Sequence, residues 1–348
     1  MAQSKTPVAF AILAAVCYGI SAPFSKVLLA GIPPAFMAAL LYLGAGIGMA
    51  AVRAFTRKGA GEVEARLSRN DMPYVVAMVA LDIAAPILLM FGLNLSNPAT
   101  VSLLGNFETV ATSLIALLLF REAIGRRLWL SIALITLASV LLSIEEIAGI
   151  KLPTGSLLVL LACVCWGIEN NCTSRLSLKN PLQIVVVKGF GSGVGALVIA
   201  LAIGGYNPGI PYVIGALALG FVAYGLSIYF YIRAQRHFGA SRTSTFYAFA
   251  PFFGVVLSLL VFRDSPSPIF WVALTIMATG AYIAASENHA HRHHHALIEH
   301  EHRHRHDDEH HMHEHQPPFQ GKHSHAHSHG ETEHSHEHTP DSHHVHKH

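Results

Sequence analysis

Charged residues are scarce in this chain. Asp, Glu, Lys and Arg together make up 13% of its 348 residues, whereas hydrophobic residues make up 52%. A soluble domain carries about a quarter charged residues, and most of the few charges here lie outside the apolar runs. These proportions exclude a soluble globular protein and predict an all-α polytopic membrane protein.

Cysteine and histidine are also sparse over most of the chain. The four cysteines, Cys17, Cys163, Cys165 and Cys172, all lie inside apolar segments, so no disulfide framework is expected. His237 is the only histidine before residue 289. The N-terminal apolar run lacks the small-residue cleavage pattern of a secretory signal peptide, and we interpret it as the first membrane span.

Ten apolar segments have the length of a membrane-spanning helix, which takes roughly 20 residues at 1.5 Å of rise each. Proline stands at the start of several segments, where a missing backbone N–H costs a helix nothing. We therefore predict ten transmembrane helices. The segments are 8–29, 34–54, 73–93, 98–120, 128–145, 155–174, 181–204, 211–232, 240–262 and 267–286.

The second half of the chain repeats the first. Three segments of one half match three segments of the other in the same order, which indicates two repeats of five helices. Because five is odd, the second repeat enters the membrane upside down, as in many secondary transporters. We predict a first repeat over 1–150, a second over 151–288 and a tail over 289–348. The matches are Val16–Ile20 with Val164–Ile168, Pro73–Val75 with Pro211–Val213, and Phe120–Glu122 with Phe262–Asp264.

Lysine and arginine gather on one side of the predicted membrane domain. If the N-terminus is cytoplasmic, the opposite side receives only Lys151 and Arg263, so the positive-inside rule predicts a multi-pass protein of the cell (inner) membrane with both termini cytoplasmic. The cytoplasmic side then holds Lys5, Arg53, Arg57, Lys58, Arg66, Arg69, Arg121, Arg126, Arg127, Arg175, Lys179, Arg233, Arg236 and Arg242.

These features resemble the EamA-like branch of the drug/metabolite transporter superfamily. That family has ten helices in two inverted five-helix repeats, with a Leu-Glu-Pro-like step near the fourth and ninth helices. Here the first repeat keeps the acid as Glu108, and the second keeps the proline as Pro251. The family's aromatic–glycine pair is Tyr18-Gly19 in the first helix and Trp166-Gly167 in the sixth.

The resemblance covers about residues 8–286 and implies a transporter with a central cavity between the repeats. Family members move amino acids, nucleosides, vitamins, metallophores and drugs, mostly outward. No Gly-x-x-x-x-Gly-Lys-Ser/Thr loop is present, so transport would be secondary rather than driven by ATP. We find no constellation of residues that indicates an enzyme, and we expect a small-molecule substrate, the lipid bilayer as partner and no nucleic acid.

A few charged residues fall inside the predicted spans. An ionised side chain at the bilayer centre costs about 2.5–3.5 kcal/mol, so it usually faces a cavity or a partner. Asp82 and Glu108 lie near mid-span in adjacent helices, and we expect them to approach one another. Two carboxylates that share a dry site do not both ionise readily, which would suit proton uptake and release. The alternative is that each charge is satisfied structurally. The candidates for the substrate and proton pathway are Asp82, Glu108, Glu169, Lys188 and Lys26.

The sixth segment places Cys165, Glu169 and Cys172 on one helical face. Thiolates with a carboxylate could hold Zn²⁺ or Cu⁺, although three ligands on one helix do not complete a tetrahedral site. The alternative is that small cysteines pack between helices.

Glycines recur at close spacing in the second and seventh segments, including Gly44, Gly48, Gly189 and Gly193. Such spacing favours close helix approach. The partner helix could belong to the same chain or to a second copy in a homodimer.

The composition changes abruptly at residue 289. Of the 25 histidines, 24 lie in 289–348, where apolar residues nearly vanish, so we expect a disordered tail without a core. Neutral imidazole is a common transition-metal ligand, and the tail could bind Ni, Co, Zn or Cu although no cofactor is required. The candidate metal ligands are His300, His302, His304, His306, His323, His325, His327, His329, His334, His336 and His338.

Three functions fit these observations. The first is proton-coupled export of a small metabolite or drug, with a cytoplasmic tail that binds transition metals. The second makes a transition-metal cation (Ni, Co or Zn) or its chelate the exported cargo. The third is a metal sensor or scaffold without transport, against which the costly charges within the membrane argue.

Overall fold

The computed structural model describes residues 5–56, 67–120, 125–148, 154–177, 179–204, 208–263, 265–285, 289–295, 298–304, 323–329 and 332–338. Some residues singled out above lie outside these ranges, namely Arg57, Lys58, Arg66, Arg121, Glu122, Lys151, Asp264 and His306.

Helices account for the membrane domain. They are α1 (Lys5–Gly19), α2 (Ser21–Leu28), α3 (Pro34–Thr56), a 3₁₀ turn η1 (Arg69–Asp71), α4 (Met72–Leu95), α5 (Pro98–Leu104), α6 (Phe107–Phe120), α7 (Arg126–Ala148), α8 (Thr154–Leu176), α9 (Pro181–Ile203), α10 (Ile210–Gly220), a π-helical turn η2 (Phe221–Leu226), α11 (Ser227–Tyr247), α12 (Ala250–Phe262) and α13 (Pro268–Ala285).

All ten segments predicted as spans are helical. Among the described residues, seven helices are long and apolar enough to cross a membrane, and Ala250–Phe262 and Pro268–Ile283 are shorter apolar helices. The structure differs from the prediction at the first, fourth and ninth segments, which we expected to be continuous. The first is divided at Ile20 into α1 and α2. The fourth is divided into α5 and α6, and the ninth begins within α11 and continues as α12.

Local sequence explains where several helices begin. In α5 the side chain of Asn97 accepts a hydrogen bond from the backbone N–H of Ala99 at 2.8 Å, and Pro98 occupies the first turn. In α9 Asn180 accepts one from the N–H of Gln183 at 2.9 Å, again directly before a first-turn proline. Each asparagine satisfies a backbone donor that a helix start leaves open.

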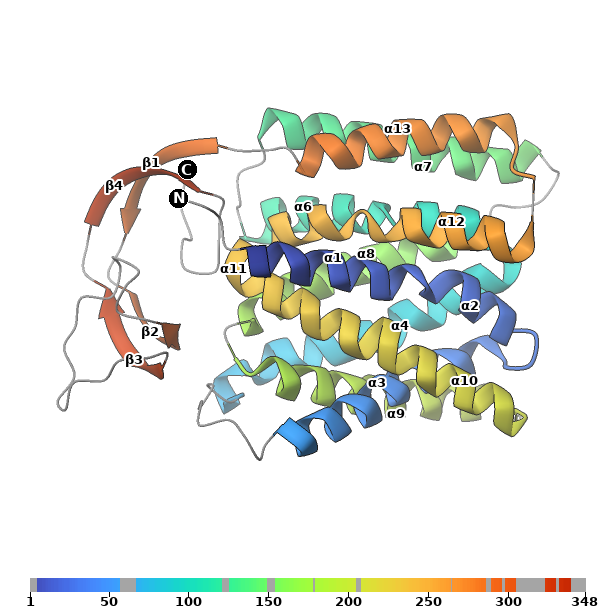
Figure 1. Cartoon of the computed structure of the whole chain (residues 1–348), viewed down its shortest axis with the longest axis horizontal. Helices are drawn as coiled ribbons and strands as arrows, with labels where there is room; N and C mark the ends of the chain where they lie inside the picture. Colours follow the sequence, from blue (N-terminus) through green and yellow to red (C-terminus); the bar gives the residue numbers. More distant parts are fainter. Residues whose placement is uncertain are drawn as a thin grey trace.

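The two repeats are interleaved rather than side by side. Two pairs of corresponding helices pack against each other: α3 lies along α9, and α7 lies along α13 (Figure 1). The fourth and ninth spans also meet, where α5 contacts α12. Helices α1, α4, α8 and α11 lie between the α3–α9 pair and the α7–α13 pair (Figure 1). The interior of the molecule is therefore built from both repeats.

Two glycines show that the repeat register holds in three dimensions. A Cβ atom on Gly19 would lie 2.6 Å from Phe253 Cβ, next to Gly254, and one on Gly167 would lie 2.7 Å from Ala111 Cβ, next to Thr112. The match of Phe120 with Phe262 makes Ala111 and Thr112 equivalent to Phe253 and Gly254. The two glycines thus lie at equivalent helix crossings, where only a residue without a side chain fits.

Two of the helix irregularities recur at matching places in the two repeats. The break at Gly105-Asn106 in the fourth span corresponds to the break at Ala248-Phe249 in the ninth to within one residue. Pro86 inside α4 and the π turn η2 fall at matching places in the third and eighth spans. Discontinuous helices near mid-membrane form the substrate sites of many transporters built from inverted repeats.

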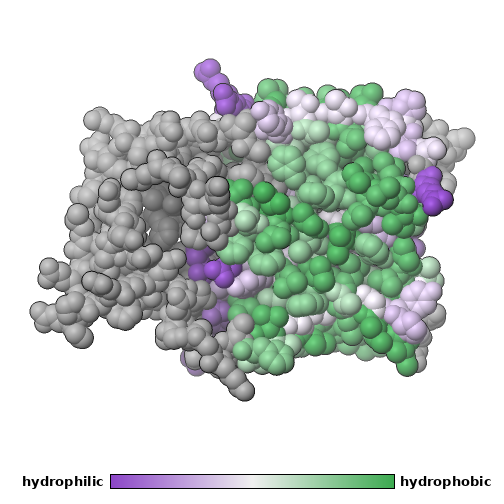
Figure 2. Space-filling view, in the orientation of Figure 1, coloured by the Kyte–Doolittle hydropathy of each residue, from purple (hydrophilic) through white to green (hydrophobic). Residues whose placement is uncertain are grey.

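The outer surface of the helical domain is apolar. Figure 2 shows a broad hydrophobic band over the helices, and exposed side chains include Val198 (61%), Ile214 (62%) and Leu260 (67%). An apolar surface of this extent suits the hydrocarbon of a bilayer. The glycines of the second and seventh spans are occupied within the chain, because a Cβ on Gly189 would lie 2.4 Å from the backbone nitrogen of Gly46.

Four strands lie within the described part of the histidine-rich segment. They are β1 (His289–His295), β2 (Ile298–His304), β3 (His323–His329) and β4 (Thr332–His338), with β1 antiparallel to β4 and β2 antiparallel to β3. The physical reason is the alternation of histidine with other residues, a period of two that an extended strand accommodates. Isolated two-stranded sheets are only marginally stable in water.

Candidate functional site

A buried lysine joins two buried acids near the middle of the helical domain. Lys188 Nζ lies 2.9 Å from Glu169 Oε1 and 3.1 Å from Asp82 Oδ2. The contact with Glu169 has hydrogen-bond geometry, whereas the contact with Asp82 is an ion pair without it. The three residues are 4%, 2% and 0% exposed, respectively, and removing one partner of such a buried ion pair would leave an uncompensated charge.

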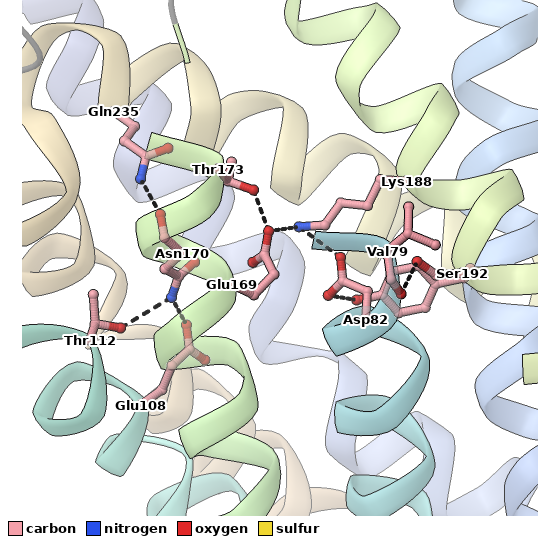
Figure 3. Close-up of polar contacts among 11 residues, drawn as sticks. Val79, Asp82, Glu108, Thr112, Glu169, Asn170, Thr173, Lys188, Ser192 and Gln235 are labelled. Atoms are coloured by element: carbon pink, nitrogen blue, oxygen red, sulfur yellow. Dashed lines mark hydrogen bonds and ion pairs between the residues drawn. The ribbon is translucent and has the colours of Figure 1, made fainter. Parts of the chain in front are cut away.

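Hydroxyl groups complete this network. The Tyr42 hydroxyl donates to Asp82 Oδ1 at 2.8 Å, and the Thr173 hydroxyl donates to Glu169 Oε1. The network spans α3, α4, α8 and α9, and Figure 3 shows Glu169, Lys188 and Asp82 in a row. Two carboxylates and one ammonium carry a net charge of −1 when all three are ionised, so one proton or one cationic ligand would neutralise them.

Helix α4 is locally irregular at Asp82. Pro86 stands four residues later and has no backbone N–H, so the carbonyl of Asp82 lacks its usual helical hydrogen bond. The counterpart of Asp82 in the second repeat is Gly220, directly before η2. The acid therefore sits at a mid-membrane position where both repeats depart from a regular α-helix.

Glu108 does not join Asp82, which corrects the expectation from sequence. Its Oε1 accepts a hydrogen bond from Asn170 Nδ2 at 2.7 Å, and the same amide lies 3.3 Å from Thr112 Oγ1. Figure 3 shows Glu108 and Asp82 on opposite sides of Glu169. The interposed helix α8 separates them, because its Glu169 turns toward Lys188 while the adjacent Asn170 turns toward Glu108.

Glu108 and part of the network line a central cavity. This cavity contains about 470 Å³ of empty space, including the part open to solvent. The helices that line this cavity extend to one face of the domain. This face carries Arg53, Arg69, Arg175 and Arg236, and we call it the basic face. The cavity is lined by Tyr18, Tyr42, Glu108, Trp166, Glu169, Asn170, Thr173, Lys188, Tyr224, Ile228, Tyr231 and Tyr247.

A second cavity lies toward the face opposite the basic face. Its lining comes from the far halves of the spans, including Leu89, Ser102 and Gly254. Tyr18 and Trp166 line both cavities, and their ring centroids lie 6.3 Å apart at an interplanar angle of 87°. Because these two residues are equivalent in the two repeats, an aromatic pair related by the duplication divides the two cavities.

Lys26, another predicted pathway residue, lies outside the linings of these two cavities. Its Nζ donates to the carbonyls of Leu93, Asn94 and Ser96 at 2.6, 3.1 and 3.0 Å. It thus caps the C-terminus of α4, where a helix leaves carbonyls without partners.

Arg236 makes a comparable contact at the basic face. Its guanidinium donates to the carbonyls of Ser177 and Lys179 at 3.1 and 2.8 Å, just after the end of α8. The two basic residues tie helix ends together on opposite faces of the domain.

The metal hypothesis for the sixth span is not supported by its geometry. Among the described residues no group of three or more His, Cys, Asp or Glu side chains could hold a metal ion. Glu169 instead accepts from Lys188 and Thr173, and Cys163 packs with its Sγ 3.7 Å from the carbonyl oxygen of Leu104. Packing is the role that the structure gives to Cys163.

Sequence reasoning missed most of the polar and aromatic residues around the charges. Asn170 and Thr173 follow Glu169 on α8, and the i, i+4 spacing of Glu169 and Thr173 is a signal that could have placed them together. Tyr42, Tyr224 and Tyr231 carried no such signal, because tyrosines in apolar helices also serve as packing residues. Only the fold brings them to one cavity.

Comparisons with known proteins agree with this architecture. A solved crystal structure superposes with a TM-score of 0.60 at 16% identity, covering 80% of this chain and 95% of that chain, which shows a shared fold. An uncharacterized transporter of Methanothermobacter thermautotrophicus is 30% identical over 292 residues, or 78% of this chain and 84% of the relative. The sequence profile of the EamA-like transporter family matches twice, at residues 5–144 and 153–286. The chain therefore belongs to the EamA-like transporter family.

Proposed function

We propose that this transporter is a secondary exporter of a small metabolite or drug, driven by protons that enter the buried charges beside the central cavity. The observation that carries the proposal is the network of Asp82, Lys188 and Glu169, which is buried and has one more acid than base. Burying an ionised side chain inside the membrane is energetically costly, so such residues usually have a function. Glu108 adds a second protonatable group on the other side of α8.

The two cavities support alternating access. Each is bounded by Tyr18 and Trp166, so a substrate that passes from one to the other must move this aromatic pair. Because the repeats are inverted, rocking of one group of helices against the other would open the two faces in turn. We further propose an orientation in the cell inner membrane with the basic face and both termini in the cytoplasm.

The test uses proteoliposomes of the full chain loaded with a deproteinised cell extract. A pH gradient is imposed, and released compounds are identified by mass spectrometry. We expect release of at least one compound to follow the gradient in the wild type and to lose that dependence in the double variant Asp82→Asn, Glu108→Gln. Gradient-driven release that persists in the double variant would rule out proton coupling through these acids.

A second proposal concerns the histidine-rich tail, which we infer binds transition metals. Cross-strand partners place histidine opposite histidine: in the sheet of β1 and β4, His291 faces His336 and His293 faces His334. In the sheet of β2 and β3, His302 pairs with His325. The strand register thus brings histidines that are distant in sequence to paired positions, and neutral imidazole is a common transition-metal ligand.

Deletion of 289–348 tests the tail. Cells carrying the full chain and the deletion are challenged with nickel, cobalt and zinc, and their metal content is measured. We expect altered tolerance or content for at least one metal. Unchanged values for all three metals would remove the tail from any role in metal handling and would also weaken the alternative that a metal is the cargo.

A further inference from the structure

The central cavity indicates the charge of its substrate, an inference that rests on the proposed transport function. We propose that the cavity binds a small monovalent organic cation, an ammonium group on a compact apolar body, with Glu108 as its counter-ion. Three features of the cavity lining favour such a ligand: its charges, its aromatic rings and one unpartnered hydroxyl.

The charge balance of the lining favours a cation. In the part of the chain that the structure describes, no lysine, arginine or histidine nitrogen lies within ion-pair distance of the Glu108 carboxylate, and its hydrogen-bond donor is the neutral amide of Asn170. Among the described lining residues the cationic side chain is that of Lys188, whose ammonium group already pairs with the carboxylates of Asp82 and Glu169. An anionic substrate would therefore meet an unpaired carboxylate and no available positive charge.

The rings of the lining suit an ammonium group. Tyr18 contacts Tyr247 and Tyr224 at centroid distances of 5.3 and 5.8 Å, and Tyr231 contacts Tyr247 at 5.0 Å. Trp166 and Tyr42 complete the aromatic part of the lining. A cation within about 6 Å of a ring centroid is attracted by the negative face of the ring, and several such rings form the usual cage for alkylated ammonium groups.

One hydroxyl of the cavity has no partner. Tyr231 is 5% exposed, and among the residues that the structure describes its hydroxyl has no hydrogen-bond partner. Buried polar groups are nearly always paired, so an unpartnered hydroxyl on a cavity wall is a contact left for a ligand. The cavity contains about 470 Å³ of empty space, including the part open to solvent, which favours a compact ligand.

Binding of choline and of its uncharged carbon analogue 3,3-dimethylbutan-1-ol tests the proposal. The full chain in lipid nanodiscs is titrated with each compound by calorimetry, and benzyltrimethylammonium and tetramethylammonium serve as further cationic probes. We expect at least one ammonium probe to bind, and choline to bind at least tenfold more tightly than its analogue. Equal affinity for choline and the analogue, or no binding of any ammonium probe, would overturn the proposal.

Variants locate the site. Glu108→Gln keeps the shape of the side chain and should weaken ammonium binding at least tenfold while leaving the uncharged analogue unaffected. Asp71→Asn is the matched control, because Asp71 lies on the basic face and pairs with Lys179 outside the cavity. Equal weakening in both variants would contradict a specific role of Glu108. If Glu108→Gln does not fold, the wild-type comparison of charged and uncharged probes still decides.

Failure of this proposal is distinguishable from failure of the transport function. If the extract-loaded proteoliposomes release anionic or neutral compounds and no ammonium probe binds, the substrate class is wrong and transport stands. If ammonium probes bind through Glu108 but no compound crosses the membrane, the site stands and the transport function falls.

Discussion

In the first repeat the charged positions inside the membrane are Asp82 and Glu108, whereas in the second they are Glu169 and Lys188. Each of these residues has an uncharged counterpart in the other repeat. Four matched pairs fix the alignment of the two repeats: Gly19 with Gly167, Pro73 with Pro211, Phe120 with Phe262, and Pro34 with Pro181. The counterparts are Gly220 for Asp82, Ala250 for Glu108, Ser21 for Glu169 and Leu41 for Lys188.

The backbone, by contrast, is closely shared. Equivalent glycines lie at equivalent helix crossings, and the fourth and ninth spans break at matching places. The difference shows that the fold does not require charge at these four positions, since each is occupied without charge in one copy. Duplication supplied a two-sided scaffold, and divergence of the two copies supplied a single asymmetric site within it.

The largest effect is expected from making the second repeat resemble the first at Lys188. The change Lys188→Leu leaves Asp82 and Glu169 buried without their cation, and removing one partner of a buried ion pair costs about 3–5 kcal/mol. We expect a large fall in the thermal midpoint of the protein in nanodiscs. The matched control is the triple variant Lys188→Leu, Asp82→Asn, Glu169→Gln, which should recover most of the loss because no buried charge remains.

A smaller loss of stability is expected when Gly19 or Gly167 is replaced by alanine, and the loss should be of similar size in the two repeats. The added Cβ would lie 2.6 Å from Phe253 in one case and 2.7 Å from Ala111 in the other. Overpacking of this kind costs about 1–3 kcal/mol. Gly209→Ala is the control, since its nearest contact is 3.7 Å. Thermal midpoints that differ strongly between the two variants would break the structural equivalence of the crossings.

The fold could be predicted well from sequence because lipid leaves few solutions. A chain with ten apolar segments must satisfy its backbone within helices, and matched stretches such as Val16–Ile20 and Val164–Ile168 show the duplication directly. The broken spans were missed because Gly105-Asn106 is a weak break signal inside an apolar run. The break depends on how α5 and α12 meet, which is a tertiary contact.

The candidate site was predicted only in part. Asp82, Glu169 and Lys188 were identified as unusual because charge inside the membrane is rare. Their pairing was not, since sequence distance says nothing about which faces of α4, α8 and α9 meet. The partners of Lys26 could not be predicted either, because they are backbone carbonyls at the end of α4, which the sequence does not identify as acceptors.

The two caps provide a subtler comparison of the repeats. Lys26→Met frees the end of α4 at the face opposite the basic face, and Arg236→Met frees the segment after α8 at the basic face. If these contacts hold the two faces closed, each variant should favour opening of its own face by population shift. The readout is maleimide labelling of Ser102→Cys and Ile228→Cys, which line the two cavities, with the native cysteines replaced by alanine.

We expect Lys26→Met to speed labelling at Ser102→Cys several-fold and Arg236→Met to speed it at Ile228→Cys. A charge-assisted hydrogen bond contributes about 1.5–3 kcal/mol at most, so larger changes would indicate unfolding rather than opening. Labelling that rises at both cysteines in either variant would show that the caps stabilise the whole domain and do not control one face.

The smallest effect is expected at Tyr231, whose counterpart in the first repeat is the buried Leu93. Tyr231→Phe removes a hydroxyl without a partner, so the thermal midpoint should stay the same or rise, by less than about 1 kcal/mol in stability. Binding of the tightest ammonium probe should nevertheless weaken two- to threefold. The two measurements distinguish two roles of the hydroxyl. Loss of a purely structural hydroxyl would lower stability, whereas loss of one that contacts a ligand would lower affinity alone. A fall in the midpoint with unchanged affinity would mean that Tyr231 serves packing, as Leu93 does, and that the second repeat contributes less to the site than its position in the cavity indicates.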